Sequence, residues 1–358
     1  MRILLYADPH WSVSSSIVRS RGEKYSTRLE NLIQSIQWVE DYAEHHGCGA
    51  VICLGDFFDT AQLNSEEITA LGEIGWAHCY HYFIAGNHEM GRSDQTYSSS
   101  NIFDLCPMSS TVTQVSVLPI YDQRDTRIVC VPYILEKNRK SLKEHLSVVK
   151  DSIDVDNLIV LSHNDIKGVQ MGSFLSTGGF SVDEIQENCK LFINGHLHNG
   201  GVVASGVINL GNLTGQNFSE DAYKYSHNAM LIDTETHEVE WIENPYAFKF
   251  YKLDFSSYLD DYITKIHQEL ARLQGPAVIT VKVSPQNELT VKEILSKSSH
   301  IVESRVIVDM ASSISSDDVQ RIELGTDHVA KFVSYIREEL GESDILLEEL
   351  SRISGEQA

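Results

Sequence analysis

Five short apolar runs in the first part of the chain end directly in loops that carry Asp, Asn or His. The runs lie near Leu5, Val51, Phe83, Val160 and Phe192. Their length and apolar character predict buried strands. Helical patterns alternate with them, as in an α/β fold, and ligands of open α/β sheets gather at the carboxyl ends of strands. We therefore expect an α/β fold whose strands bring the five loops together.

The five loops offer carboxylate, amide and imidazole groups. In residues 8–10 and 196–198, such side chains occupy alternate positions, so each pair shares one face of an extended segment. This mixture suits Mn²⁺, Fe²⁺ or Zn²⁺ and differs from a structural zinc site built on thiolates. The sequence therefore predicts a metal centre. The loops are Asp8-Pro9-His10, Gly55-Asp56, Gly86-Asn87-His88-Glu89, Ser162-His163 and Gly195-His196-Leu197-His198.

Helix signals are clearest near the start of the chain. Thr27 and Glu30 have capping-box spacing and precede an apolar stripe that ends at Gly47. A second helix is predicted from Ser65 to Gly75. Further strands are expected at 113–118, 127–131, 158–161, 191–194 and 202–210, with a closing hairpin of 228–233 and 239–242.

The chain changes character after Asn244-Pro245. A strand, a helix and a strand between 277 and 308 predict a small β-α-β unit. Two amphipathic helices are predicted beyond it, near 327–340 and 344–353. We expect three parts: a main domain over 1–248, a small domain over 249–310 and a helical segment over 311–358.

Composition restricts how such a chain meets its partners. With 28 Lys and Arg against 51 Asp and Glu, the formal net charge is −23. A chain this acidic does not bind nucleic acid through its overall charge, so handling DNA would require bound cations, a local basic patch or a basic partner. The six cysteines lack a CxxC pair, which favours reduced thiols, and we find neither a signal peptide nor a membrane span. We expect a soluble, cytoplasmic protein.

The order of motifs DxH, GDxxD, GNHE, H and GHxH resembles the signature of the calcineurin-like metallophosphoesterases, over most of residues 1–200. The resemblance implies a β-sandwich flanked by helices, with two metals at one end. It implies that Asp56 bridges both metals. Asp8, His10 and His198 would complete the ligands of one metal, and Asn87, His163 and His196 those of the other.

The resemblance also implies that His88 is the catalytic imidazole over the scissile phosphate. An imidazole can position a phosphate or protonate a leaving oxygen near neutral pH. Asp59, three residues after Asp56, could orient His88. Two divalent ions roughly 3.5–4 Å apart can activate water and hold both the attacking and the leaving oxygen of a phosphoester.

Within this superfamily, the chain resembles the nuclease subunit of SbcCD-type recombination and repair complexes, including short phage-encoded forms. The resemblance rests on Gly55-Asp56-Phe57-Phe58-Asp59-Thr60, on 211–220 and on 248–255, although some relatives have His where this chain has Asp59. It implies manganese-dependent 3′-to-5′ exonuclease activity on duplex ends and endonuclease activity on single strands. It also implies a homodimer and a coiled-coil ATPase partner of the SbcC type, in the host cytoplasm if the protein is phage-encoded. The chain itself has no GxxxxGK[ST] phosphate loop.

Basic residues follow the first metal motif. Arg19, Arg21 and Lys24, with Arg28 beyond them, are placed to contact a DNA backbone. A solvated loop whose charges offset nearby acids is the alternative. Two similar choices concern contacts between chains. The apolar stripe of 346–353 either docks on the ATPase or packs on its own domain, and 63–74 and 101–105 form either a dimer contact or ordinary core.

Two other functions fit parts of the pattern. A small-nucleotide phosphodiesterase or pyrophosphatase would share the metals, but it would not need the small domain and terminal helices. A non-enzymatic scaffold with the same fold would typically have lost ligands. All the ligand positions and His88 are present here, so we favour an enzyme.

Overall fold

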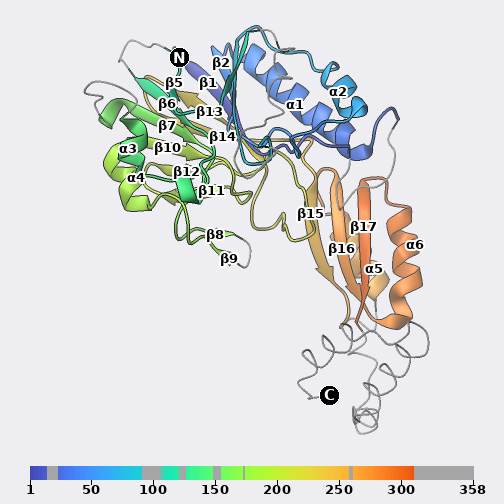
Figure 1. Ribbon diagram of the computed structural model, residues 1–358. Helices are drawn as coiled ribbons and strands as arrows, with labels where there is room; N and C mark the ends of the chain where they lie inside the picture. The colour runs from blue at the N-terminus through green and yellow to red at the C-terminus, as the bar shows by residue number, and fades with distance from the viewer. Residues whose placement is uncertain are drawn as a thin grey trace, which may run out of the picture.

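The computed structural model describes residues 1–13, 23–90, 106, 108–120, 126–147, 155–171, 174–257 and 261–309. Two six-stranded sheets pack face to face in this part of the chain, and a three-stranded sheet extends from one end of them (Figure 1). The α/β sandwich flanked by helices that the sequence predicts is confirmed. The terminal helices predicted at 327–340 and 344–353 lie outside the described residues, as do Arg19 and Arg21.

The first sheet has the strand order β14-β13-β1-β2-β3-β4. Its four strands β1 to β4 are parallel to one another, and the hairpin of β13 and β14 joins β1 in antiparallel orientation. Helices α1 and α2 cover its outer face (Figure 1). The bounds are β1 Arg2–Tyr6, β2 Ala50–Cys53, β3 Tyr80–Ile84, β4 Ser109–Val112, β13 Asn228–Asp233, β14 Val239–Glu243, α1 Thr27–His45 and α2 Ser65–Leu71.

The second sheet has the order β11-β12-β10-β7-β6-β5, with β6, β7, β10 and β12 parallel. Helices α3 and α4 lie on its outer side (Figure 1). Apolar side chains from the facing sides of both sheets, such as Leu5, Ile52, Leu161 and Ile193, form the buried core between them. The bounds are β5 Ser116–Val117, β6 Arg127–Val131, β7 Leu158–Ser162, β10 Leu191–Asn194, β11 Gly201–Ala204, β12 Val207–Asn209, α3 Leu142–Leu146 and α4 Val182–Asn188.

The third sheet, called the small sheet below, consists of β15, β16 and β17, all parallel. Ile266 of α5 and Val291 and Leu295 of α6 pack into its apolar cluster. The β-α-β unit predicted between 277 and 308 is confirmed. The bounds are β15 Lys249–Asp254, β16 Ala277–Val283, β17 Ile301–Val308, α5 Tyr262–Leu270 and α6 Glu288–Ser296. A short hairpin, β8 Gln170–Met171 with β9 Phe174–Leu175, and the 3₁₀ turns 136–138, 155–157 and 285–287 complete the described elements.

Several local predictions differ from the structure. The strand expected at 113–118 is reduced to β5, and the helix expected from Ser65 to Gly75 ends at Leu71. The single strand expected at 202–210 is an antiparallel pair, β11 and β12, because the chain reverses at Gly206, whose φ is 74°. Such a backbone angle suits glycine. At the start of α1, the N-cap is Ser26 rather than Thr27. The Ser26 side chain accepts from Leu29 N, while Glu30 accepts from the backbone N–H groups of Lys24 and Tyr25.

Helix α1 also carries three buried polar residues on one face, Arg28, Asn31 and Ser35, which we call the α1 polar stripe. Their spacing of three and four residues places them one above another. Thr214 donates to Asn31 Oδ1 at 2.9 Å, and Asn244 donates to Ser35 Oγ at 3.0 Å. The stripe therefore binds the segments that lead from the sandwich into the small sheet.

Candidate metal centre

The five loops predicted from the sequence converge at the carboxyl ends of β1, β2, β3, β7 and β10. Three groups of side chains each place potential ligand atoms within 4.8 Å of one another. Asp56 and His10 each belong to two of these groups, so the three groups form one continuous cluster. The groups are Asp8 with His10 and His198, His10 with Asp56 and His88, and Asp56 with His163 and His196.

Distances between nitrogen and oxygen atoms show how compact the cluster is. His10 Nε2 lies 3.3 Å from His198 Nε2 and 3.9 Å from Asp56 Oδ2. His163 Nε2 lies 3.1 Å from the same Asp56 oxygen. Lone pairs this close repel unless a proton or a cation lies between them. The His/Asp clusters are therefore consistent with a dimetal site.

Buried atoms without hydrogen bonds support this fit. In the described part of the chain, Asp8 Oδ1, Asn87 Oδ1, His163 Nε2 and His196 Nδ1 are buried and make no hydrogen bond. A buried polar atom without a partner is costly. All four atoms belong to predicted ligands, one atom per residue, so a pair of bound cations would satisfy them together.

Partners on the far side of each imidazole determine which nitrogen faces the cluster. His163 Nδ1 lies 2.7 Å from the Leu54 carbonyl oxygen, which fixes its proton there and leaves the Nε2 lone pair for a metal. His196 is turned the other way. Its Nε2 lies 3.4 Å from Asp165 Oδ1, so Nδ1 is the free nitrogen. Asp165 has no role in the sequence-based prediction, although it follows His163 by only two residues.

The ligand loops are held in strained backbone conformations. Asp8, His10, Asp56 and His196 have positive φ angles of 50°, 49°, 48° and 69°. Non-glycine residues rarely adopt such angles, and they do so mainly at functional sites where surrounding contacts enforce them. Here Asp8 N donates to the Gly55 carbonyl and His10 N donates to the Asp56 carbonyl, both at 3.1 Å. The first two ligand loops therefore support each other.

Glycine is required beside the Asp56 carboxylate. A Cβ atom on Gly86 would lie 2.1 Å from Asp56 Oδ1, and one on Gly55 would lie 2.2 Å from His163 Nδ1. Both separations are far below any van der Waals contact. Only glycine therefore leaves room for the neighbouring ligand side chains at these two positions.

His88 lies beside the cluster with its Nδ1 at 2.7 Å from the Asp59 carbonyl oxygen. The proton of that hydrogen bond belongs to Nδ1, so Nε2 is the nitrogen available to a substrate. The Asp59 carboxylate is closer to His10 Nδ1, at 3.1 Å, than to His88 Nδ1, at 3.6 Å. Asp59 therefore contacts His88 mainly through its backbone, and its side chain orients His10.

Glu89 is a structural part of the site to which sequence reasoning gave no role. Its buried carboxylate accepts from the backbone N–H groups of Asp56, Phe58 and Gly86, at 3.2, 2.8 and 2.7 Å. Burial, and secondarily the charge of Asp56, raise the pKa of Glu89 to about 7. The carboxylate ties the second ligand loop to the third. The only sequence signal is its position directly after His88.

Arg28 is not the exposed loop residue expected from the sequence. It is buried in α1 and donates from Nη1 to the Gly215 carbonyl and from Nη2 to the Pro9 carbonyl, both at 2.9 Å. Gln216 Nε2 donates to the Asp8 carbonyl at 2.7 Å. The first ligand loop is thereby bound to the segment around residue 215, which the sequence linked to the site only by resemblance.

Lys24 is exposed, and its Nζ lies 2.6 Å from Glu73 Oε1. The ion pair offsets the charge of Lys24, as the solvated-loop alternative expects. An exposed ion pair is weak, so another anion can replace Glu73. Arg19 and Arg21 lie outside the described residues. The predicted DNA contact of these three residues therefore stays a prediction.

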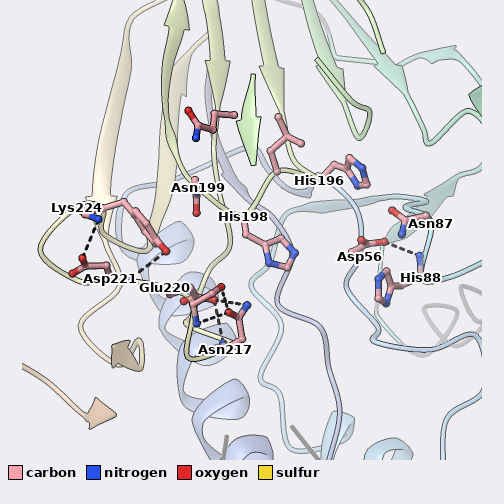
Figure 2. A pocket seen from close by; sticks show the side chains of 14 residues that line it. Asp56, Asn87, His88, His196, His198, Asn199, Asn217, Glu220, Asp221 and Lys224 are labelled. Carbon is pink, nitrogen blue, oxygen red and sulfur yellow. Dashed lines mark hydrogen bonds and ion pairs between the residues drawn. The ribbon is translucent and has the colours of Figure 1, made fainter. Parts of the chain in front are cut away.

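A pocket of about 650 Å³ opens onto the cluster. One wall carries Asp56, Asn87 and His88, and His198 lies between them and the opposite wall, which is formed by residues 217–225 (Figure 2). Lys224 lies on that far wall with Nζ 3.4 Å from Asp221 Oδ2. The pocket therefore extends well past the metal ligands.

Buried ionisable groups lie behind the far wall. Glu220 Oε1 accepts from the backbone N–H groups of Gln216 and Asn217 at 2.9 and 3.2 Å, and burial raises the pKa of Glu220 to about 7. His227 Nε2 lies 3.5 Å from Glu220 Oε2, and burial lowers the pKa of His227 to about 4. The far wall is therefore held in place by buried hydrogen bonds of Glu220.

Two solved structures are similar to parts of this chain. Among solved structures, a dimetal phosphatase from Danio rerio is 13% identical, with a TM-score of 0.38, over 68% of this chain and 98% of its own. A protein of unknown function from Aquifex aeolicus is 14% identical, with a TM-score of 0.26, over 55% of this chain and 79% of its own. A search of curated proteins gives no match.

None of the described helices combines the length and apolar character needed to span a bilayer. The sequence profile of the calcineurin-like phosphoesterases matches residues 1–200, which contain all five ligand loops. That match covers more than half of the chain, and the clustered Asp and His side chains supply the metal-binding groups of a phosphoesterase. The chain belongs to the calcineurin-like phosphoesterase family and is a metal-dependent phosphoesterase.

Proposed function

We propose that this chain is a DNA nuclease that hydrolyses phosphodiesters with two divalent ions, Mn²⁺ being the metal we expect. The observation that carries the proposal is the extent of the pocket. Its lining continues from His88 and the metal ligands to Lys224 and Tyr225 on the opposite wall. A pocket that ends at the metals would suit a terminal phosphate, whereas this one leaves room for groups on both sides of phosphorus.

The seven predicted ligands would hold the ions, with Asp56 shared between them. When bound, the two ions lower the pKa of water and stabilise the charge that develops on the phosphate. His88 has its Nδ1 engaged by the Asp59 carbonyl, so Nε2 can bind the phosphate or carry the proton that the leaving oxygen takes. Asp165 and Asp59 would keep His196 and His10 in the required orientation.

DNA is favoured over a small nucleotide by the parts of the chain beyond the metal loops. Residues 211–220 and 248–255 resemble the corresponding segments of SbcCD-type nucleases, and they lead into the small sheet. We therefore propose 3′-to-5′ exonuclease activity on duplex ends and endonuclease activity on single strands. The same resemblance supports a homodimer that works with a coiled-coil ATPase in recombination and repair, with 249–310 as a capping domain and 311–358 as the ATPase-binding segment.

We include Arg19, Arg21 and Lys24 as contacts to the DNA backbone. Neutralising all three together should weaken cleavage of long DNA and reduce its salt dependence, since phosphate contacts by lysine and arginine produce that dependence. Lys224→Met, on the wall opposite the metals, tests the same point inside the pocket. Unchanged cleavage and salt dependence in the triple variant would remove that contact from the proposal.

The decisive experiment measures Mn²⁺-dependent cleavage of end-labelled linear duplex DNA and of a single-stranded circle by the purified chain. His88→Gln serves as the inactive control, and bis-p-nitrophenyl phosphate serves as a small phosphodiester. Cleavage of DNA that disappears in the variant supports the nuclease. If the ester alone is hydrolysed, with and without the ATPase partner, the substrate is a small nucleotide and the DNA proposal is wrong.

A further inference from the structure

A second pocket, of about 340 Å³, adjoins the metal pocket. Tyr225 lines both. The second pocket lies between residues 222–227 and the start of the small sheet. Tyr223, Tyr251, Lys249 and Arg272 contribute to its lining. None of these four residues belongs to the metal centre. Tyr223 lies in the same segment of the chain as the far wall of the metal pocket.

The aromatic side chains of this pocket form a prearranged surface. The rings of Tyr223 and Tyr251 meet edge to face, with centroids 5.2 Å apart. Tyr251 is buried, and its hydroxyl donates to the Gln274 carbonyl at 3.2 Å and accepts from Gln274 N at 3.3 Å. Tyr223 is 62% exposed. The buried ring of Tyr251 therefore supports one side of the Tyr223 ring. The exposed part of the Tyr223 ring is open to a ligand.

The charges in the pocket are unusual for so acidic a chain. Of the described residues that line it, Lys249 and Arg272 are cationic and Glu243 is the carboxylate. Glu243 pairs with Lys249, and Glu269, outside the lining, pairs with Arg272 at 2.7 Å. The Arg272 side chain is 70% exposed, so its ion pair is weak enough for a phosphate to compete for the guanidinium, and Lys249 lies beside it in the same lining.

We propose that this second pocket binds one unpaired nucleotide of the same DNA strand whose reacting phosphate lies in the metal pocket. The base would stack on Tyr223, and the adjoining backbone phosphate would lie near Lys249 and Arg272. Stacking on aromatic side chains combined with nearby cations is how proteins hold single strands without reading their sequence. The inference rests on the proposed nuclease function and assigns a place to the strand beyond the reacting phosphate.

The test compares Tyr223→Ala and Tyr223→Phe with a matched control, Tyr80→Ala, in the full chain. Tyr80 is 57% exposed and begins β3, at the end of the strand opposite the ligand loops. For each protein, kcat and KM are measured with Mn²⁺ on a short single-stranded thymidine oligonucleotide and on bis-p-nitrophenyl phosphate. The quantity compared is kcat/KM for the oligonucleotide divided by kcat/KM for bis-p-nitrophenyl phosphate.

We expect Tyr223→Ala to lower that ratio about ten-fold, mainly through the KM for the oligonucleotide, because one base loses its stacking partner. Tyr223→Phe keeps the ring and should restore the ratio, and Tyr80→Ala should leave it unchanged. An unaltered ratio in Tyr223→Ala, or an equal fall in Tyr80→Ala, would overturn the nucleotide site while the nuclease proposal stood. Failure of the unmodified chain to cleave the oligonucleotide while it hydrolyses the ester would overturn both.

Discussion

Arg28 Nη2 donates to the carbonyl oxygen of Pro9 at 2.9 Å, and Pro9 is the residue between the predicted ligands Asp8 and His10. The second arm of the guanidinium donates to the Gly215 carbonyl. The carbonyl oxygens of Asp8 and Pro9 thus point toward α1 and the segment around residue 215. The side chains of Asp8 and His10 are left to face the cluster of candidate ligands.

Arg28→Met should therefore weaken Mn²⁺ binding. Residues that orient metal ligands typically change metal affinity by about 10- to 100-fold when replaced. Calorimetric titration of the metal-free chain with Mn²⁺ measures this. Ser35→Ala is the matched control, because Ser35 is equally buried on the same face of α1 but binds Asn244 instead of the ligand loop. Both variants should lose about 1–3 kcal/mol of stability to urea, and equal metal affinities in the two would refute the role of Arg28.

His88→Gln should lower kcat for bis-p-nitrophenyl phosphate by about 10²- to 10⁴-fold, the usual contribution of a positioned acid or base. Mn²⁺ stoichiometry should stay the same, because the predicted ligand set is complete without His88. Metal analysis after gel filtration checks this. His88 also lies within ligand distance of His10 and Asp56. Loss of one bound ion in the variant would therefore show that His88 is a metal ligand.

Glu89→Gln should destabilise the chain even without metal. The carboxylate accepts three backbone N–H groups, and an amide replaces one of its oxygens with a donor that faces a donor. Each unsatisfied buried group costs about 1–3 kcal/mol. Urea unfolding in the presence of a chelator measures the loss. A variant as stable as the parent chain would mean that these hydrogen bonds contribute nothing to the fold.

The Glu220 and His227 pair predicts a specific pH dependence in the metal-free chain. Burial raises the pKa of Glu220 from 4.5 to about 7, so its contribution to stability is complete at low pH and is lost as pH rises between these values. Burial lowers the pKa of His227 from 6.5 to about 4, so its contribution is present above 6.5 and is lost as pH falls toward 4. The two slopes oppose each other in the parent chain.

Glu220→Gln removes the first slope. The variant's free energy of unfolding should then rise from pH 4.5 to pH 6.5 more steeply than that of the parent chain. Urea unfolding at a series of pH values gives both curves. Parallel curves would show that Glu220 titrates at its ordinary pKa in the folded state.

The clustering of the candidate metal ligands could be predicted from the sequence because that information is local. Each ligand follows a recognisable strand, and parallel strands present their carboxyl ends at one edge. Arg28 was misplaced because its burial depends on Gly215, which lies far away along the chain. In the sequence, Arg28 follows other basic residues and therefore resembles part of a solvated loop, because the segment that buries it lies elsewhere in the chain.

The same limit applies to Asp165 and Glu89. Their roles depend on which nitrogen of His196 is free and on which backbone N–H groups point inward. Side-chain type and spacing do not contain that information. Helix α5 was also missed. Its apolar residues Tyr262, Ile266 and Leu270 are four positions apart, so the helical pattern was present in the sequence, and these side chains pack against the small sheet.

The α1 polar stripe has a mechanical consequence. Apolar faces can slide past one another with little penalty, whereas hydrogen bonds fix both distance and direction. Asn31 and Ser35 hold the strand connections that lead to β15, and Arg28 holds the first ligand loop through the same helix face. The small sheet and the first ligand loop are therefore joined through one face of α1 by directional hydrogen bonds, so we expect a displacement of the small sheet to shift the first ligand loop as well.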